Sequence, residues 1–109
     1  MSDNRRQYYR LPYPATMMPL IRIAGKEYSV PEISEGGLRI RCTDRNDFGI
    51  GDEVSGEIAF AENDTLTISG VILRRDGKDL IIAPLEGISF KRVVREQRRV
   101  LSQCPSVAH

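Results

Sequence analysis

Residues 54–72 read VSGEIAFAENDTLTISGVI, and this stretch decides the fold class. On each side of the central polar residues, an apolar residue or a glycine stands at every second position, with a polar or small residue between, except at Val71. Successive side chains of a β-strand point to opposite faces, so this alternation is typical of a strand with one buried face. The stretch therefore predicts two successive β-strands.

The same alternation continues outward in both directions. Upstream it returns at residues 38–43, and earlier extended segments at 17–23 and 28–30 are separated by a tight turn at Gly25-Lys26. Downstream, Asp76-Gly77 is a hairpin-turn signal, and residues 80–90 form a last extended run in which Pro84 indicates a bulge or an edge position. Six short strands without intervening helices predict a mainly all-β fold, a six-stranded antiparallel β-barrel that is closed or nearly closed.

The hydrophobic period changes near the C-terminus. Val94, Gln97 and Leu101 share one helical face, so we expect a short helix from about residue 94 that docks on the barrel and is ended by Pro105. Its charged residues are expected to point largely elsewhere: Arg92, Arg95, Glu96, Arg98 and Arg99. The domain layout is then an N-terminal arm (1–13), the barrel with its helix (14–105) and a tail (106–109).

Length and composition narrow the class of protein. The chain has 109 residues, which suits one domain, and its 40% hydrophobic and 28% charged residues are typical of a globular protein. The longest apolar run, residues 15–21, is far shorter than the roughly 20 residues that a membrane span needs. The first ten residues lack the apolar core of a secretory signal, so we expect a cytoplasmic protein without membrane insertion.

The residue types that carry most catalysis and metal binding are scarce. The cysteines, Cys42 and Cys104, form no metal motif, and the only histidine is His109, the last residue. No nucleophile–base–acid set and no phosphate-binding glycine loop is present. We therefore expect neither an enzyme nor a metal protein.

Arginine dominates the basic residues, and it gathers in two short motifs. Thirteen of the sixteen Lys and Arg residues are arginine. The first motif, in the arm, is Arg6 followed by Arg10, with Arg5 immediately before it. The second is residues 32–37, EISEGG, which lead into Leu38 and Arg39. Taken singly, the first motif also suits a solvated basic tail, and the second also suits a turn whose serine bonds its own backbone.

In this order and on this framework the two motifs resemble the PilZ family, whose members carry RxxxR in an N-terminal segment and (D/N)xSxxG before a barrel strand. The resemblance covers nearly the whole chain. Residues 51–54 (GDEV) are similar to the family's GDxV turn, residues 70–75 (GVILRR) to its GxVxRx strand, and residues 87–90 (GISF) to its GIxF strand. It implies a PilZ-type β-barrel with a flexible arm, which binds the bacterial second messenger cyclic di-GMP on the outer barrel surface.

The resemblance also implies the roles of the site residues. Arg6 and Arg10 would hold guanine or phosphate, since a guanidinium pairs with either in bidentate fashion. Glu32 would accept from the guanine edge, Ser34 would donate, and Gly36 and Gly37 would complete a turn that allows close approach. The remaining two candidates are Arg39, which either faces the ligand or is a plain surface arginine, and Arg5, which in the family accompanies binding of two stacked ligand molecules.

One position departs from the family pattern, because Glu32 stands where the family has Asp or Asn. This glutamate favours one alternative function, a PilZ-fold protein-interaction module that has lost cyclic di-GMP binding.

A barrel for single-stranded nucleic acid is not expected, because the strands carry few exposed aromatic residues for base stacking. The preferred hypothesis is a receptor without other cofactors that orders its arm on binding and signals through an unidentified downstream protein. Nothing in the sequence selects an oligomeric state.

Overall fold

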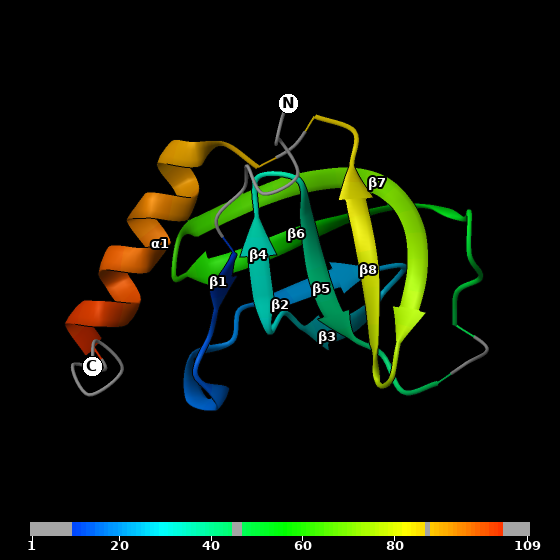
Figure 1. Cartoon of the computed structure of the whole chain (residues 1–109), viewed down its shortest axis with the longest axis horizontal. Coiled ribbons are helices and arrows are strands. Elements are labelled where there is room, and N and C mark those ends of the chain that lie inside the picture. Colours follow the sequence, from blue (N-terminus) through cyan, green and yellow to red (C-terminus); the bar gives the residue numbers. More distant parts are fainter. Residues whose placement is uncertain (1–9, 45–46, 87, 104–109) are drawn as a thin grey trace, which may run out of the picture.

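One curled antiparallel sheet makes up most of the computed structural model, with a helix beside one end of it (Figure 1). The structure describes residues 10–44, 47–86 and 88–103. In these ranges the sheet has eight strands in the order β1-β4-β5-β8-β7-β6-β2-β3. The strands are β1 (Leu11–Pro12), β2 (Leu20–Ile23), β3 (Lys26–Ser29), β4 (Glu32–Ser34), β5 (Gly37–Arg41), β6 (Glu53–Ala61), β7 (Asp64–Asp76) and β8 (Asp79–Pro84), and a 3-10 turn η2 (Ala15–Met17) precedes β2.

The predicted mainly β class is confirmed, but the sheet has two more strands than the six expected. The additional strands, β1 and β4, are two and three residues long. Segments this short show no periodic alternation, so pairing with a neighbour is what makes them strands. The turn between β2 and β3 also lies one residue earlier than expected, at Ala24-Gly25, where both residues have positive φ (53° and 85°).

The two strands predicted from residues 54–72, β6 and β7, alternate between a buried and an outer face as expected. β6 and β7 form a long hairpin in which Ile58, Phe60, Ile68 and Ile72 are buried. A register shift in β7 between Ile72 and Arg74 interrupts its pairing with β8. Bulges of this kind bend a strand and increase its twist. The sheet therefore curls around the core instead of lying flat.

The connector between β3 and β4 ties the two ends of the sheet together. The Val30 amide donates to the Pro19 carbonyl, next to β2, and the Tyr13 amide donates to the Pro31 carbonyl, each over 2.9 Å. Val30 is fully buried. This segment therefore bridges the gap between the two edges of the curled sheet, near β1 and β3.

The helix α1 (Phe90–Gln103) begins four residues earlier than expected, and β8 ends at Pro84 instead of extending to residue 90. The Ser89 hydroxyl accepts a hydrogen bond from the Arg92 amide (3.1 Å), which caps the helix and explains its start. No helix among the described residues is both long and apolar enough to span a bilayer.

The expected docking face of the helix was wrong by one residue. The buried side chains are Val93, Glu96 and Val100, whereas Leu101 is 39% exposed. One residue turns a helix by about 100°, so this offset moves the whole face. Glu96 was expected to point away from the barrel, and instead it is the most buried charged side chain described.

Candidate ligand-binding surface

The β4–β5 hairpin brings the second motif onto the outer face of the sheet. Ile33 of β4 and Leu38 and Ile40 of β5 are buried, so their neighbours in the alternate phase point outward. Glu32 is paired directly with Arg39, and Ser34 with Gly37. Residues that are three to seven positions apart in the sequence therefore stand side by side on one surface.

The described end of the arm lies against this hairpin. Arg10 immediately precedes β1, whose Pro12 pairs with Glu32 of β4. The Arg10 Nε is 3.8 Å from the Glu32 Oε2, and the Arg39 Nε is 3.8 Å from the Glu32 Oε1. The Glu32 carboxylate therefore lies between two guanidinium groups. Arg10 remains 70% exposed, whereas Arg39 is only 20% exposed.

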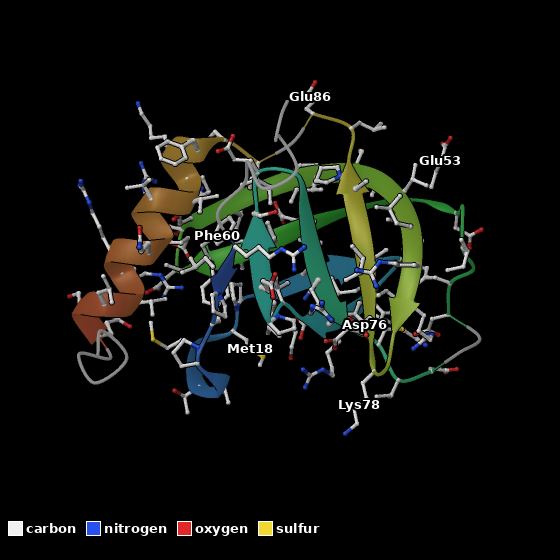
Figure 2. The ribbon with its side chains drawn as sticks, viewed as in Figure 1. Met18, Glu53, Phe60, Asp76, Lys78 and Glu86 are labelled. Atoms are coloured by element: carbon white, nitrogen blue, oxygen red, sulfur yellow. The ribbon has the colours of Figure 1, made fainter. Side chains whose placement is uncertain are left out.

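Arg39 is more than a plain surface arginine, because two further carboxylates hold it. Its Nη1 donates to Asp76 over 2.9 Å and to Asp79 over 3.2 Å (Asp76 is labelled in Figure 2). Partial burial lowers the pKa of Arg39, because it disfavours the charged form. The hydrogen bonds to Asp76 and Asp79 have the larger combined effect, so the pKa of Arg39 is raised overall. Arg41 donates to the other oxygen of Asp79 over 2.6 Å. The sequence reasoning missed both aspartates, whose place at the β7–β8 turn becomes adjacent to β5 only through strand pairing.

Ser34 and Gly37 have local roles in the turn. The Ser34 hydroxyl donates to the Gly37 carbonyl over 3.3 Å, so in this structure the serine bonds nearby backbone. A Cβ on Gly37 would lie 3.2 Å from the Ile82 carbonyl oxygen, tighter than ordinary contact. Close packing against β8 is therefore the reason for glycine at this position. Gly36 is exposed in the two-residue turn.

The outer face continues onto β8, where Ile81 is paired with Arg39 on one side and with Arg74 on the other. Leu80 and Ile82 point into the core, so the half-buried Ile81 lies in the outward phase. An apolar side chain between two arginines gives a flat ligand a surface to lie on and cations at its edges. Ile81 and Arg74 were not among the residues expected from the sequence.

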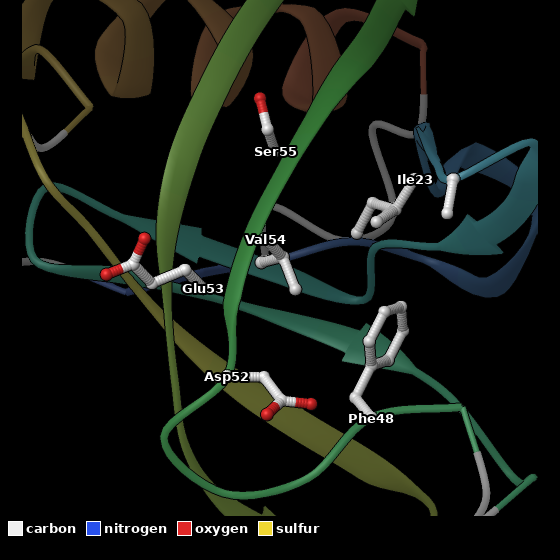
Figure 3. Close-up of a pocket in the computed structure, with 7 residues that line it drawn as sticks. Ile23, Phe48, Asp52, Glu53, Val54 and Ser55 are labelled. Carbon is white, nitrogen blue, oxygen red and sulfur yellow. The ribbon is translucent and has the colours of Figure 1, made fainter.

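A shallow pocket of about 370 Å³ lies elsewhere on the sheet (Figure 3). Figure 3 shows Phe48 and Val54 facing each other across the hollow, with Asp52 below Val54. Among the described residues, its lining has two carboxylates, Asp52 and Glu53, and no basic side chain. A phosphate-bearing ligand would be repelled there, so we assign the candidate site to the β4–β5–β8 face instead.

Two expected site residues, Arg5 and Arg6, lie outside the described residues. The structure brings together the other six, Arg10, Glu32, Ser34, Gly36, Gly37 and Arg39. The described ranges contain no cluster of three or more metal-ligating side chains. The surface suits an anionic ligand with flat rings, held by arginines and by one carboxylate that can accept hydrogen bonds.

Comparison with known proteins bears on the family and the fold of the chain. The family model described as "PilZ domain" matches residues 4–104. Among solved structures, the chain is similar to the "PilZ domain with c-di-GMP of YcgR from Escherichia coli", with a TM-score of 0.63, 18% sequence identity and coverage of 91% of both chains. Curated proteins gave no match. At this identity the structural likeness concerns the fold.

Proposed function

The chain belongs to the PilZ domain family, and we propose from this premise that it is a cytoplasmic receptor for cyclic di-GMP that acts by binding and not by catalysis. The observation that carries the proposal is the position of Glu32 between Arg10 and Arg39 on the outer face of β4 and β5. Arg10, the described residue of the first motif, thereby lies beside Glu32 of the second motif.

The chemistry of cyclic di-GMP suits these groups. The molecule has two phosphates and two guanines, and guanidinium groups bind both kinds of target and also stack on bases. Arg6 and Arg10 would clamp the ligand from the arm, while Arg39 and Ile81 would form its floor. Ser34 would exchange a long hydrogen bond of 3.3 Å for one to the ligand, which costs little because that bond is weak.

Glu32 has to be re-aimed if it is to accept from the guanine N1 and N2 edge. Its two arginine neighbours stand at 3.8 Å, beyond hydrogen-bond distance, so the carboxylate is held electrostatically and not by directed bonds. Glutamate is one methylene longer than the Asp of the family motif, and a poorly aimed hydrogen bond loses on the order of 1 kcal/mol. Binding is therefore expected, with reduced affinity.

Ligand binding would order the arm up to Arg10 over the β4–β5 face, since residues 11–13 already pair with β4 or pack in the core. Fixing each backbone residue costs roughly 1–2 kcal/mol, and the arginine contacts have to supply it. We further propose that Arg5 caps a second guanine, so that two ligand molecules bind per chain. The signal would then pass to a downstream protein that reads the changed surface.

Calorimetric titration of the chain with cyclic di-GMP tests the proposal. We expect saturable binding with two ligands per chain, and one ligand per chain for Arg5→Ala. A plateau at one ligand for the unmodified chain would remove the role of Arg5. Absence of saturable binding up to about 100 μM would instead favour the alternative, a protein-interaction module that no longer binds the ligand.

A further inference from the structure

We propose that the solvent face of α1 docks an acidic helical segment of a partner protein. The inference rests on the proposed function only in taking this partner to be the downstream protein. We call the docking surface the basic face and define it by Lys91, Arg95 and Arg98. It lies on the opposite side of the helix from Val93, Glu96 and Val100, which are buried against the sheet.

The three cations of the basic face are available for a partner. They are exposed and stand at positions i, i+4 and i+7, which share one side of a helix. Within the described ranges none of them has an ion pair within 4.0 Å. Arg95 acts on the carboxyl of Asp64 only over a longer distance.

The other two arginines of α1 differ, because both are used to hold the helix. Arg92 donates to Asp64 over 2.8 Å, and its guanidinium lies 4.5 Å from the centre of the Phe60 ring (Phe60 is labelled in Figure 2). Arg99 pairs with Glu96 over 2.9 Å. Structural anchoring therefore accounts for these two arginines but not for the three on the basic face.

An apolar strip runs along one edge of the basic face. Phe90 is 59% exposed and Leu101 is 39% exposed, and the half-buried Val94 lies between them on the helix surface. Exposed aromatic side chains beside arginines are the composition that protein interfaces favour. The strip gives a partner helix apolar contacts in addition to charge pairing.

Charge is separated between the helix and the rest of the chain. Five of the sixteen basic residues and one of the fifteen acidic residues lie in α1, so the helix has a net charge of +4 and the remainder of the chain −3. The two outer cations are about 10 Å apart along the axis, the spacing of acidic residues at i and i+7 on another helix. The complementary partner is a helix with Glu or Asp at that spacing.

Two other kinds of partner fit less well. A nucleic acid would meet a negatively charged remainder of the molecule, whereas phosphate-backbone binding needs extended positive surface. A helix that lies in a membrane interface needs a free apolar face, but the side of α1 that carries Val93 and Val100 is packed against the sheet. An acidic polypeptide remains the best match.

The test uses a synthetic, fluorescein-labelled 14-residue helical peptide with Glu at i, i+4 and i+7 and Leu along one edge. Its anisotropy is followed as the whole chain is added. We expect saturable binding that weakens about tenfold in the double variant Lys91→Glu/Arg98→Glu, because two attractive charges become repulsive. The matched control Arg22→Glu/Lys78→Glu changes the net charge equally at exposed sites on β2 and the β7–β8 turn and should bind like the unmodified chain. Phe90→Ala, which leaves charge unchanged, should weaken binding about threefold.

Several outcomes would overturn the docking surface. These are no saturable peptide binding, equal weakening in both double variants, or tighter binding of phosphatidylserine vesicles or of a single-stranded oligonucleotide than of the peptide. If the unmodified chain is a dimer by sedimentation and Lys91→Glu/Arg98→Glu is a monomer, the face belongs to a second copy of the chain.

Cyclic di-GMP titration of the same variants should match the unmodified chain. If no chain binds cyclic di-GMP while the peptide still binds, the receptor function fails and the docking surface stands.

Discussion

The Tyr13 hydroxyl donates a 2.7 Å hydrogen bond to Oε1 of Glu96, a residue 83 positions later in the sequence and 1% exposed. Glu96 also accepts from Arg99, over 2.9 and 3.2 Å. Burial, and then the hydrogen bond to Glu96, raise the pKa of Tyr13 well above its usual value, so its hydroxyl stays protonated and keeps donating. Tyr13 is three residues from Arg10, so the arm side of the sheet and the helix with the basic face share one buried anchor.

Replacing Tyr13 by Phe should lower the free energy of unfolding by about 1–3 kcal/mol, because the buried Oε1 of Glu96 loses one of its two donors. Urea denaturation monitors the change. Tyr28→Phe is the matched control, since its hydroxyl donates over the same 2.7 Å to Asp47. Asp47 also pairs with Lys26 and is less buried than Glu96. The free energy of unfolding should therefore fall less in Tyr28→Phe than in Tyr13→Phe. Equal losses in the two variants would contradict the importance of the buried anchor.

Replacing Arg10 by Ala should abolish measurable cyclic di-GMP binding and leave the melting temperature nearly unchanged. Its one ion pair with a described residue is long and largely exposed, and such pairs contribute about 0–1 kcal/mol. Calorimetry and thermal unfolding measure the two effects. Arg22→Ala removes an equally exposed arginine on β2 and should bind normally. Arg6→Ala is expected to behave like Arg10→Ala, and normal binding by both would refute the arm-centred site.

Replacing Glu32 by Asp should tighten cyclic di-GMP binding about five- to tenfold, since the shorter side chain restores the family's spacing and about 1 kcal/mol of hydrogen bonding. Glu57→Asp, on the outward phase of β6, is the control and should leave affinity unchanged. Affinity that falls or stays the same in Glu32→Asp would mean that this carboxylate does not contact the ligand.

Replacing Gly70 by Ala should destabilise the barrel by about 1–3 kcal/mol or more, as overpacking does. The added Cβ would lie 2.5 Å from the Ala83 carbonyl oxygen and 2.9 Å from the Ile82 Cγ2, within the paired strands β7 and β8. Gly37→Ala meets its nearest atom at 3.2 Å and should cost less stability. Thermal denaturation compares the two, and an unchanged midpoint for Gly70→Ala would show that the strands can separate locally.

Stability should fall on acidification because of Asp47. Hydrogen bonds from Lys26 and then from Tyr28 hold the pKa of Asp47 below its usual value, which is about 3.9 in an unfolded chain. A depressed folded-state pKa contributes stability that is present above the unfolded pKa and is lost as the pH falls through the folded pKa. Urea midpoints measured from pH 7 down to below 4 should therefore decline less in Asp47→Asn than in the unmodified chain. Glu62→Gln, at the β6–β7 turn, controls for the removal of one carboxyl group, and identical curves for all three would disprove the contribution.

The sequence by itself predicted the features that depend on local periodicity. The buried phase of β6 and β7 follows from side chains that alternate between two faces, as Ile58 and Ile68 do. The hairpin signalled by Asp76-Gly77 is present, although its turn is Gly77-Lys78 because Asp76 still pairs with Asp79; Gly77 has the φ of +64° that glycine readily adopts. The motif residues Glu32, Ser34 and Gly37 could be recognised in advance because their spacing resembles a family pattern.

Only the tertiary structure decided which distant residues meet. The short strands β1 and β4 exist because they pair with each other, and that pairing sets Arg10 beside Glu32. Glu96 reads as a surface residue in a charged helix, and it is buried because Tyr13 and Arg99 satisfy its carboxylate. Burying a carboxylate is favourable only where such partners exist, and a partner 83 positions away leaves no signal in a local pattern.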